Sequence, residues 1–196
     1  MFALAAAASF AAAVPRYEDS WIAAAVDWPT RGVDRNDYAS ITAEITVDPR
    51  GYASDCHASA TAGNPNMAPY TCQLLKKRAQ FAPARDPGGR KIYGLHRSHL
   101  LWWNRDNMHE GLVPYDFAAR VGPEIAKAQG DKLTRISYAV DASGSLLSCG
   151  PLSDKDDSAV AAEACKQLPQ SLRRPVLDRK GKPTVAVEDA LVKAVE

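Results

Sequence analysis

Two cysteine pairs with the same spacing are the feature that most constrains the fold of this chain. Cys56 and Cys72 are 16 residues apart, and so are Cys149 and Cys165. An Asp-x-x-Gly turn precedes each pair, and a Pro-x-x-Asp-x-x-Gly loop follows it. The second turn and cysteine pair lie 93 positions after the first set, and the second loop lies 92 positions after the first loop. This shared order predicts an internal duplication into two small units.

The cysteine spacing favours disulfides over a metal site. Four cysteines in two matched pairs are typical of an oxidising compartment. Zinc is the alternative, but structural zinc sites usually bring their cysteines in close pairs such as C-x-x-C. We therefore predict that Cys56 bonds to Cys72 and that Cys149 bonds to Cys165. Closing a loop of this length contributes roughly 3 kcal/mol in the chain-entropy model.

The first 14 residues are almost entirely apolar. Such a run is shorter than the roughly 20 residues of a membrane-spanning helix, but it fits the apolar core of an export signal. Small residues near Ala11 to Ala13 would end that signal. No Lys or Arg precedes the run, so an alanine-rich helix is the alternative. We predict that residues 1–14 form a signal peptide and that the protein is periplasmic or secreted; a membrane-associated location stays open.

The next two segments carry the local signals of a short N-terminal helix and of a β-β-α-β unit. Residues 15–37 hold Trp21, Ala24 and Ala25 at helical spacing, followed by a linker. In residues 38–103, strict apolar alternation from Ile41 to Val47 predicts a half-buried strand. A tight turn, a second strand from 52 to about 60, a helix over 68–79 and a long third strand over 91–103 follow it.

The second unit repeats this order of strands and helix after a connector. Residues 104–132 form the connector, with a helix predicted over 123–129. Residues 133–196 hold strands at 133–140, 145–149 and 183–187 and a helix over 158–168, and the tail 188–196 is predicted to be helical. We expect an α+β protein of two β-β-α-β repeats, with an antiparallel sheet and the helices packed on one face.

Three short motifs of the first unit carry a family resemblance. They are V-D-x-x-G at Val47, Asp48 and Gly51, F-x-P-A at Phe81, Pro83 and Ala84, and Asp86 with Gly89 before the last strand. With these motifs, residues 38–103 resemble the C-terminal domain of the TonB family of periplasmic energy transducers, and residues 133–187 resemble it weakly, as a degenerate second copy would.

The resemblance implies a non-enzymatic domain that binds peptide segments or outer-membrane transport partners by strand addition. The sequence lacks the long proline-rich spacer and membrane anchor that a transducer needs. The resemblance therefore implies partner binding without energy transduction.

The third strand of the first unit is the candidate binding edge. Its aromatic and amphipathic side chains suit either core packing or the docking of a partner strand or a second copy of the chain. The edge residues are Tyr93, Leu95, Arg97, His99, Trp102 and Trp103.

Other functional classes have weaker signals. A net charge of +1 with interspersed signs disfavours nucleic-acid binding. Neighbouring Cys56 and His57 would point to opposite faces of a strand, as would His96 and His99, so neither pair predicts catalysis or a metal site. We predict no catalytic, cofactor or metal residues. A small secreted thiol, redox or hydrolytic enzyme and a purely structural envelope protein remain the alternatives.

Overall fold

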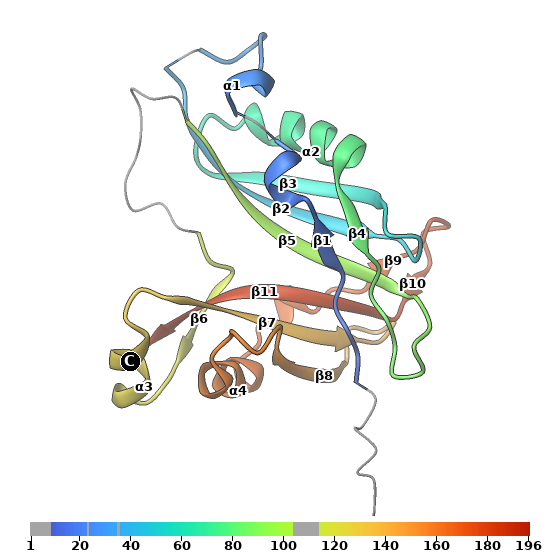
Figure 1. Cartoon of the computed structure of the whole chain (residues 1–196), viewed down its shortest axis with the longest axis vertical. Coiled ribbons are helices and arrows are strands. Elements are labelled where there is room, and N and C mark those ends of the chain that lie inside the picture. Colours follow the sequence, from blue (N-terminus) through green and yellow to red (C-terminus); the bar gives the residue numbers. More distant parts are fainter. Residues whose placement is uncertain (1–8, 23, 35, 104–113) are drawn as a thin grey trace, which may run out of the picture.

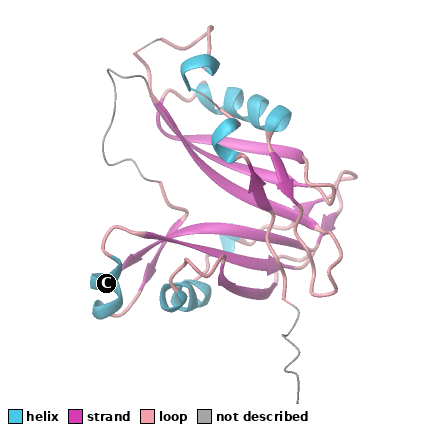
Figure 2. Ribbon diagram, viewed as in Figure 1, coloured by secondary structure: helices cyan, strands magenta, loops and turns pink. Residues whose placement is uncertain are grey.

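A mixed seven-stranded sheet forms the centre of the protein (Figure 1). The computed structural model describes residues 9–22, 24–34, 36–103 and 114–196. The strand order is β3-β2-β5-β11-β7-β8, and β6 pairs with β11 outside this path. Helices lie against the sheet (Figure 2), so the predicted α+β class is confirmed.

The first half contains a hairpin, a helix and a long strand, as the sequence predicts. The hairpin joins β2 (Ala39–Val47) to β3 (Ala53–Gly63), and α2 (Met67–Arg78), β4 (Gln80–Ala82) and β5 (Tyr93–Trp102) follow. The hairpin turn needs Gly51, which has φ 90° and whose added Cβ would lie 2.2 Å from the carbonyl oxygen of Phe81.

The second half has the same order of elements. It comprises β7 (Leu133–Val140), β8 (Leu146–Pro151), α4 (Ser158–Lys166), the 3-10 turn η2 (Gln170–Leu172), β9 (Val176–Leu177), β10 (Pro183–Thr184) and β11 (Ala186–Val195). Its hairpin turn again depends on a glycine: a Cβ on Gly144 would lie 2.4 Å from the carbonyl oxygen of Arg173.

Both predicted disulfides are present. Cys56 on β3 bonds to Cys72 on α2, and Cys149 on β8 bonds to Cys165 on α4. Each disulfide therefore joins the outer hairpin strand of its half to the helix that covers it. The two disulfides indicate an oxidising, extracytoplasmic setting.

The sheet arrangement differs from the prediction in two respects. Strands β5 and β11 pair in parallel, so the sheet is mixed rather than antiparallel. The helices also lie on opposite faces (Figure 1). Ala139 packs in the core on the α2 side, whereas its neighbour Tyr138 packs in the core beneath α4. Because neighbouring strand residues point to opposite faces, α2 and α4 cannot share a face.

The predicted helical tail is wrong, because residues 186–195 form strand β11. Ala190, Val192 and Ala194 are buried at every second position, and this period of two is that of a strand. The predicted N-terminal helix is also replaced by shorter elements: β1 (Val14–Arg16), η1 (Glu18–Ser20) and α1 (Ala24–Asp27).

The described part of the connector holds β6 (Phe117–Arg120) and α3 (Pro123–Gln129). The helix has the bounds that the sequence predicts. Residues 104–113 of the connector lie outside the described ranges.

Part of the predicted signal peptide packs on the folded domain. The backbone N–H of Ala11 donates to the carbonyl oxygen of Arg85, and the carbonyl oxygen of Ala11 accepts from the N–H of Arg85, each at 2.9 Å. Strand β1 pairs with β4. Ala13 is only 4% exposed. Residues 1–8 of the predicted signal lie outside the described ranges. In the described ranges, no helix is long and apolar enough to cross a membrane.

Candidate binding surface

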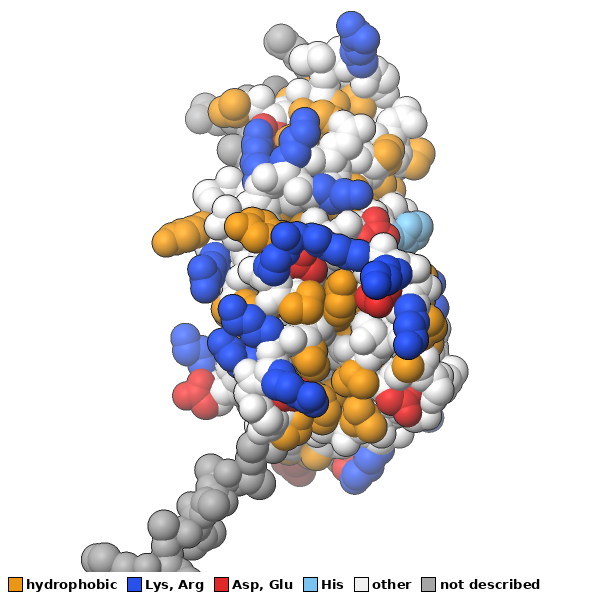
Figure 3. All heavy atoms as spheres, turned by 90° about the vertical axis from the view of Figure 1, so that its right-hand side faces the viewer, with side chains coloured by type: hydrophobic (Ala, Val, Ile, Leu, Met, Phe, Trp, Pro, Cys, Tyr) orange, Lys and Arg blue, Asp and Glu red, His pale blue; other side chains and the backbone are white. Residues whose placement is uncertain are grey.

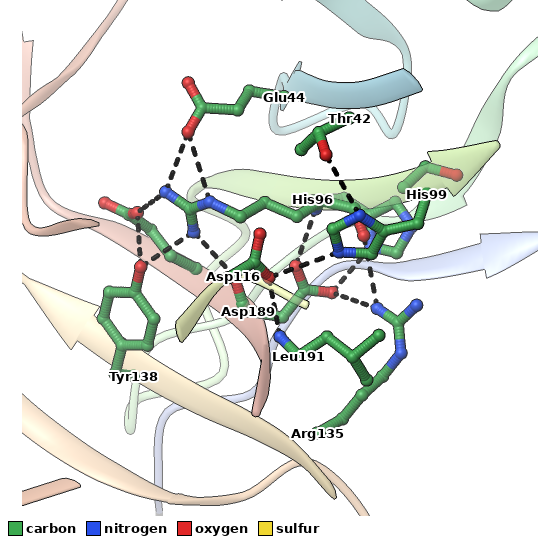
Figure 4. Close-up of polar contacts among 12 residues, drawn as sticks. Thr42, Glu44, His96, His99, Asp116, Arg135, Tyr138, Asp189 and Leu191 are labelled. Carbon is green, nitrogen blue, oxygen red and sulfur yellow. Dashed lines mark hydrogen bonds and ion pairs between the residues drawn. The ribbon is translucent and has the colours of Figure 1, made fainter. Parts of the chain in front are cut away.

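A buried arginine, Arg97 of β5, stands where the two halves of the sheet meet. Figure 4 shows two of its partners, Glu44 and Tyr138. Strands β5 and β11 pair over only three residues each, from Tyr93 and Ala186 onward, and then separate. Beyond this point the Arg97 guanidinium, 2% exposed, contacts carboxylate oxygens of Glu44 and Glu188 at 3.2 Å. It also donates to the hydroxyl of Tyr138 at 2.8 Å.

Burial and charge act in opposite directions on this group. Burial alone disfavours the charged guanidinium, but Tyr138, Glu188 and Glu44 outweigh it and raise the pKa of Arg97. Burial raises the pKa of Glu188 to about 7, against the opposing effect of Arg97. One oxygen of this carboxylate, Oε1, is buried without a hydrogen-bond partner among the described residues.

A second charged group lies on the other face of the same strands. The ring of His96 bonds through Nδ1 to Asp189 at 2.7 Å and through Nε2 to Glu18 at 3.4 Å. Burial alone would lower the pKa of His96, but the two carboxylates outweigh it and raise the pKa to about 9. His96 therefore carries a positive charge at neutral pH, and Asp189 also contacts Arg135 at 3.4 Å.

The second group contains side chains used in hydrolases, but not in an accessible arrangement. Ser98 donates to Glu18 at 3.2 Å, and Glu18 contacts His96. Ser98 is only 3% exposed, so a substrate would not reach its hydroxyl without rearrangement. The cysteines are all held in disulfides. Within the described ranges, no cluster of three potential metal ligands is present.

A cavity of about 480 Å³ opens on the face of the first half that α2 does not cover. Its floor includes Glu44, Thr46, Leu95, Arg97 and Glu188. The loop from Arg174 to Gly181 forms one wall, and Asp55 and His57 of β3 form another. Figure 3 looks onto the side of the molecule where β9 and β10 lie, and shows Lys and Arg side chains next to carboxylates there.

Free sheet edges lie at β3 and β8. Strand β3 pairs with β2 alone, and β8 pairs with β7 alone, in the sheet order of the described residues. Strand β3 has 11 residues, whereas β8 has six and ends at Pro151. The longer edge, β3, borders the cavity through Ser54, Asp55 and His57.

The prediction that the third strand is a free edge is wrong for its first residues, 93–95; beyond Leu95 the strand pairs, among the described residues, with β2 alone. Strand β5 lies inside the sheet, between β2 and β11, because the second half supplies a central partner that local sequence does not indicate. Tyr93 and Leu95 pair with Ala186 and Glu188 of β11.

The other residues predicted for that edge lie in three different environments. Arg97 belongs to the central charged group, and His99 contacts Thr42 at 3.2 Å and Asp116 at 3.4 Å. Trp102 is buried and donates to Thr71 at 2.8 Å. Only Trp103, just after the strand, keeps a large exposed surface, with 41% exposure. The aromatic side chains of this strand thus serve mainly the core.

Sequence reasoning missed the cavity. Its residues come from β2, β3, β5, β11 and the loop after α4, so no local motif marks it. One signal was present in the sequence. On β2, Glu44 lies between Thr42 and Thr46 on the same face, and its cross-strand neighbour on β5 is Arg97. A buried cross-strand pair of opposite charge could have been expected from that register.

Comparisons with known proteins yield no relative. No family model, no curated protein and no solved structure matches the chain.

Proposed function

We propose that the protein is an extracytoplasmic module, built from two β-β-α-β units of TonB C-terminal-like design, that binds extended peptide segments by strand addition. Its partner is a polypeptide of the cell envelope, such as a segment of an outer-membrane transporter. The binding is non-catalytic. The disulfides support the compartment, and the matched order of hairpin, helix and strand in the two halves supports the duplication.

The free edge of β3 is the observation that carries the proposal. The outer edge of this 11-residue strand, which pairs with β2 on its other side, offers a row of backbone donors and acceptors. Proteins normally block such an edge with Pro, Lys or a short length. From Ala53 to Gly63, β3 contains neither Pro nor Lys. Outward Asp55, His57 and Ser59 are exposed on one face and would lie beside alternate side chains of an added strand.

Selection of random 12-residue peptides displayed on phage, with the oxidised protein as bait, tests this proposal. Amide hydrogen exchange of the complex should show new protection along β3. Backbone N–H groups alternate between the two edges of a strand, so one of the variants Ser59→Pro and Ala60→Pro removes an outward donor and the other disrupts the pairing with β2. The variant that stays folded should lose peptide binding at least tenfold.

The matched control is Leu147→Lys on β8, at the opposite end of the sheet, which should leave binding unchanged. Protection that appears outside β3, or undiminished binding to the folded proline variant, would contradict strand addition at this edge. Protection of β3 that depends only on protein concentration would indicate instead that two copies pair through this edge.

A further inference from the structure

The loops that follow the two helices occupy matched positions. A Cβ on Gly51 would meet the carbonyl of Phe81 and the ring of Pro83, whereas a Cβ on Gly144 would meet the carbonyl of Arg173 and the ring of Pro175. The loop residues that the second turn contacts thus lie 92 positions after those that the first turn contacts. By this offset, residues 174–177 correspond to residues 82–85.

The chain lays its own N-terminal segment, residues 10–16, along the first of these loops. Val14 pairs with Ala82, and Ala11 exchanges two backbone hydrogen bonds with Arg85. The segment is extended and antiparallel to the loop. Between these contacts, Ala13 is buried in a core cluster that includes Ala139 and Val187.

The corresponding place in the other half is the cavity. Ala139 pairs with Val187, and two residues further along β7 comes the turn residue Asp141. In the other half, Thr46 pairs with Leu95 and likewise lies two residues before the turn residue Asp48. Thr46 and Leu95 are therefore the equivalents of Ala139 and Val187.

Both Thr46 and Leu95 line the cavity, and so do all four residues of the loop at 174–177. The cavity therefore has the walls that, in the other half, hold the N-terminal segment. No described segment of the chain fills it.

We infer that the cavity is a binding site for an extended segment of a partner polypeptide, which runs antiparallel to residues 174–177 as residues 11–14 run along residues 82–85. The position equivalent to Ala13 faces Thr46 and Leu95, so it takes a small side chain. The position equivalent to Val14 lies beside Arg174 and takes a carboxylate.

Charge at the rim selects the acidic side chain. The loop from 173 to 182 carries five basic residues and one acidic residue. Arg174 and Arg179 have side chains that are 71% and 52% exposed, although each contacts a carboxylate of the first half, Glu44 and Asp48 respectively. The acidic groups of the floor have partners within the protein: Glu44 contacts Arg97 and Arg174, and Glu188 contacts Arg97, while burial raises the pKa of Glu188 to about 7. An incoming carboxylate therefore meets arginines with remaining donors.

This site goes beyond strand addition at β3, because it uses a different backbone segment, residues 174–177, although the side chains of Asp55 and His57 border both. A partner could engage one without the other. The amide signals that shift when a peptide binds distinguish the cavity site from strand addition at β3.

The probe is a capped nonapeptide that copies residues 9–17 with Val14→Glu, titrated into the ¹⁵N-labelled oxidised protein and followed by amide chemical shifts. We expect shifts at Thr46, Leu95, Arg174 and residues 176–178. The same peptide with Val14→Lys should bind about fivefold more weakly, as expected when an exposed ion pair becomes a like-charge contact. The acidic peptide with an added Ala13→Trp change should not bind, since the position over the floor has room for a small side chain only.

Variants of exposed residues at the rim of the cavity change the charge of the site without unfolding the protein. Arg174 is largely exposed, so Arg174→Glu should leave the spectrum folded and reverse the preference, making the Val14→Lys peptide the tighter ligand. Arg174→Ala should abolish the preference. The control Arg120→Glu, at an exposed position of β6, should preserve it.

Three results would overturn the inference. The first is the absence of shifts at the cavity amides at millimolar peptide, and the second is an unchanged charge preference in Arg174→Glu. Shifts confined to residues 55–61 would also overturn it, while supporting strand addition at β3. Conversely, shifts confined to the cavity would support this site and leave strand addition without support from this peptide.

Discussion

The two halves of the molecule differ less in their elements than in what lies on their uncovered sheet faces. In the second half, the face that α4 leaves open is closed by the N-terminal segment: Ala13 packs with Ala139 and Val187, and Glu18 contacts His96, which bonds to Asp189. In the first half, the corresponding face carries Glu44, Arg97 and the cavity. The apolar packing around Ala13 suits a permanent intramolecular lid, whereas the exposed arginines at the rim of the cavity, Arg174 and Arg179, keep that face hydrated and available to a polar partner. The difference suggests that one face serves stability and the other serves binding.

Removing the central arginine should destabilise the protein most. Arg97→Met leaves Glu188 buried beside Tyr138 without its counter-charge, and loss of one partner from a buried ion pair costs about 3–5 kcal/mol. Urea unfolding at pH 8 measures this loss. Arg135→Met is the matched control, because Arg135 is 28% exposed and contacts Asp189 at 3.4 Å, so its loss should cost about 1 kcal/mol or less. Equal effects of the two variants would show that the halves are not held together at Arg97.

The disulfides should contribute unequally, although they close loops of equal length. Each contributes roughly 3 kcal/mol in the chain-entropy model. The helix held by Cys165 buries only Val160, Ala161 and Ala164, whereas α2 also buries larger side chains such as Met67, Leu74 and Leu75.

We therefore expect the double variant Cys149→Ala, Cys165→Ala to lower the melting temperature further than the matching variant of Cys56 and Cys72. Calorimetry of the two variants compares them directly. A larger loss in the first half would mean that helix packing does not set the difference.

Alkaline pH should weaken the contact between the N-terminal segment and the sheet. The folded-state pKa of His96 is raised to about 9, so its stabilisation is complete below the unfolded value near 6.5 and is lost as pH rises through 9. The shift corresponds to roughly 2–3 kcal/mol between pH 6.5 and pH 10.

Unfolding free energies measured across this range should fall in the wild type and fall less in His96→Gln. The groups facing the ring are Asp189 and Glu18, with Arg135 behind Asp189. Parallel pH profiles for the two proteins would assign the slope to other groups.

Local patterns allowed prediction of each unit but not of their assembly. The alternation from Ile41 to Val47, the cysteine spacing and the proline at the start of α3 are signals within one element, and each led to the correct strand, disulfide or helix. The tail failed because Glu188 and Asp189 look like an exposed helix start, whereas both are buried against partners from β5. The central place of β5 and the cavity depend on contacts between residues more than 90 positions apart, which no local period encodes.

The smallest expected effect concerns the N-terminal segment. A chain that starts at Val14 lacks the two hydrogen bonds between Ala11 and Arg85 and the burial of Ala13. These contacts contribute about 0.5–1.5 kcal/mol per hydrogen bond and about 0.8 kcal/mol for the methyl group, and the freed chain entropy offsets part of them. We expect a chain starting at Val14 to be about 1 kcal/mol less stable than one starting at Ser9.

This difference bears on export, because signal cleavage at Ala11 to Ala13 would remove residues that pack on the second half. We expect the mature terminus to lie before Phe10, and intact mass of the exported protein locates it. A mature chain that begins at Val14 would leave the second face partly open. The two halves would then each offer a place for an extended partner segment, and the distinction between a stabilising face and a binding face would disappear.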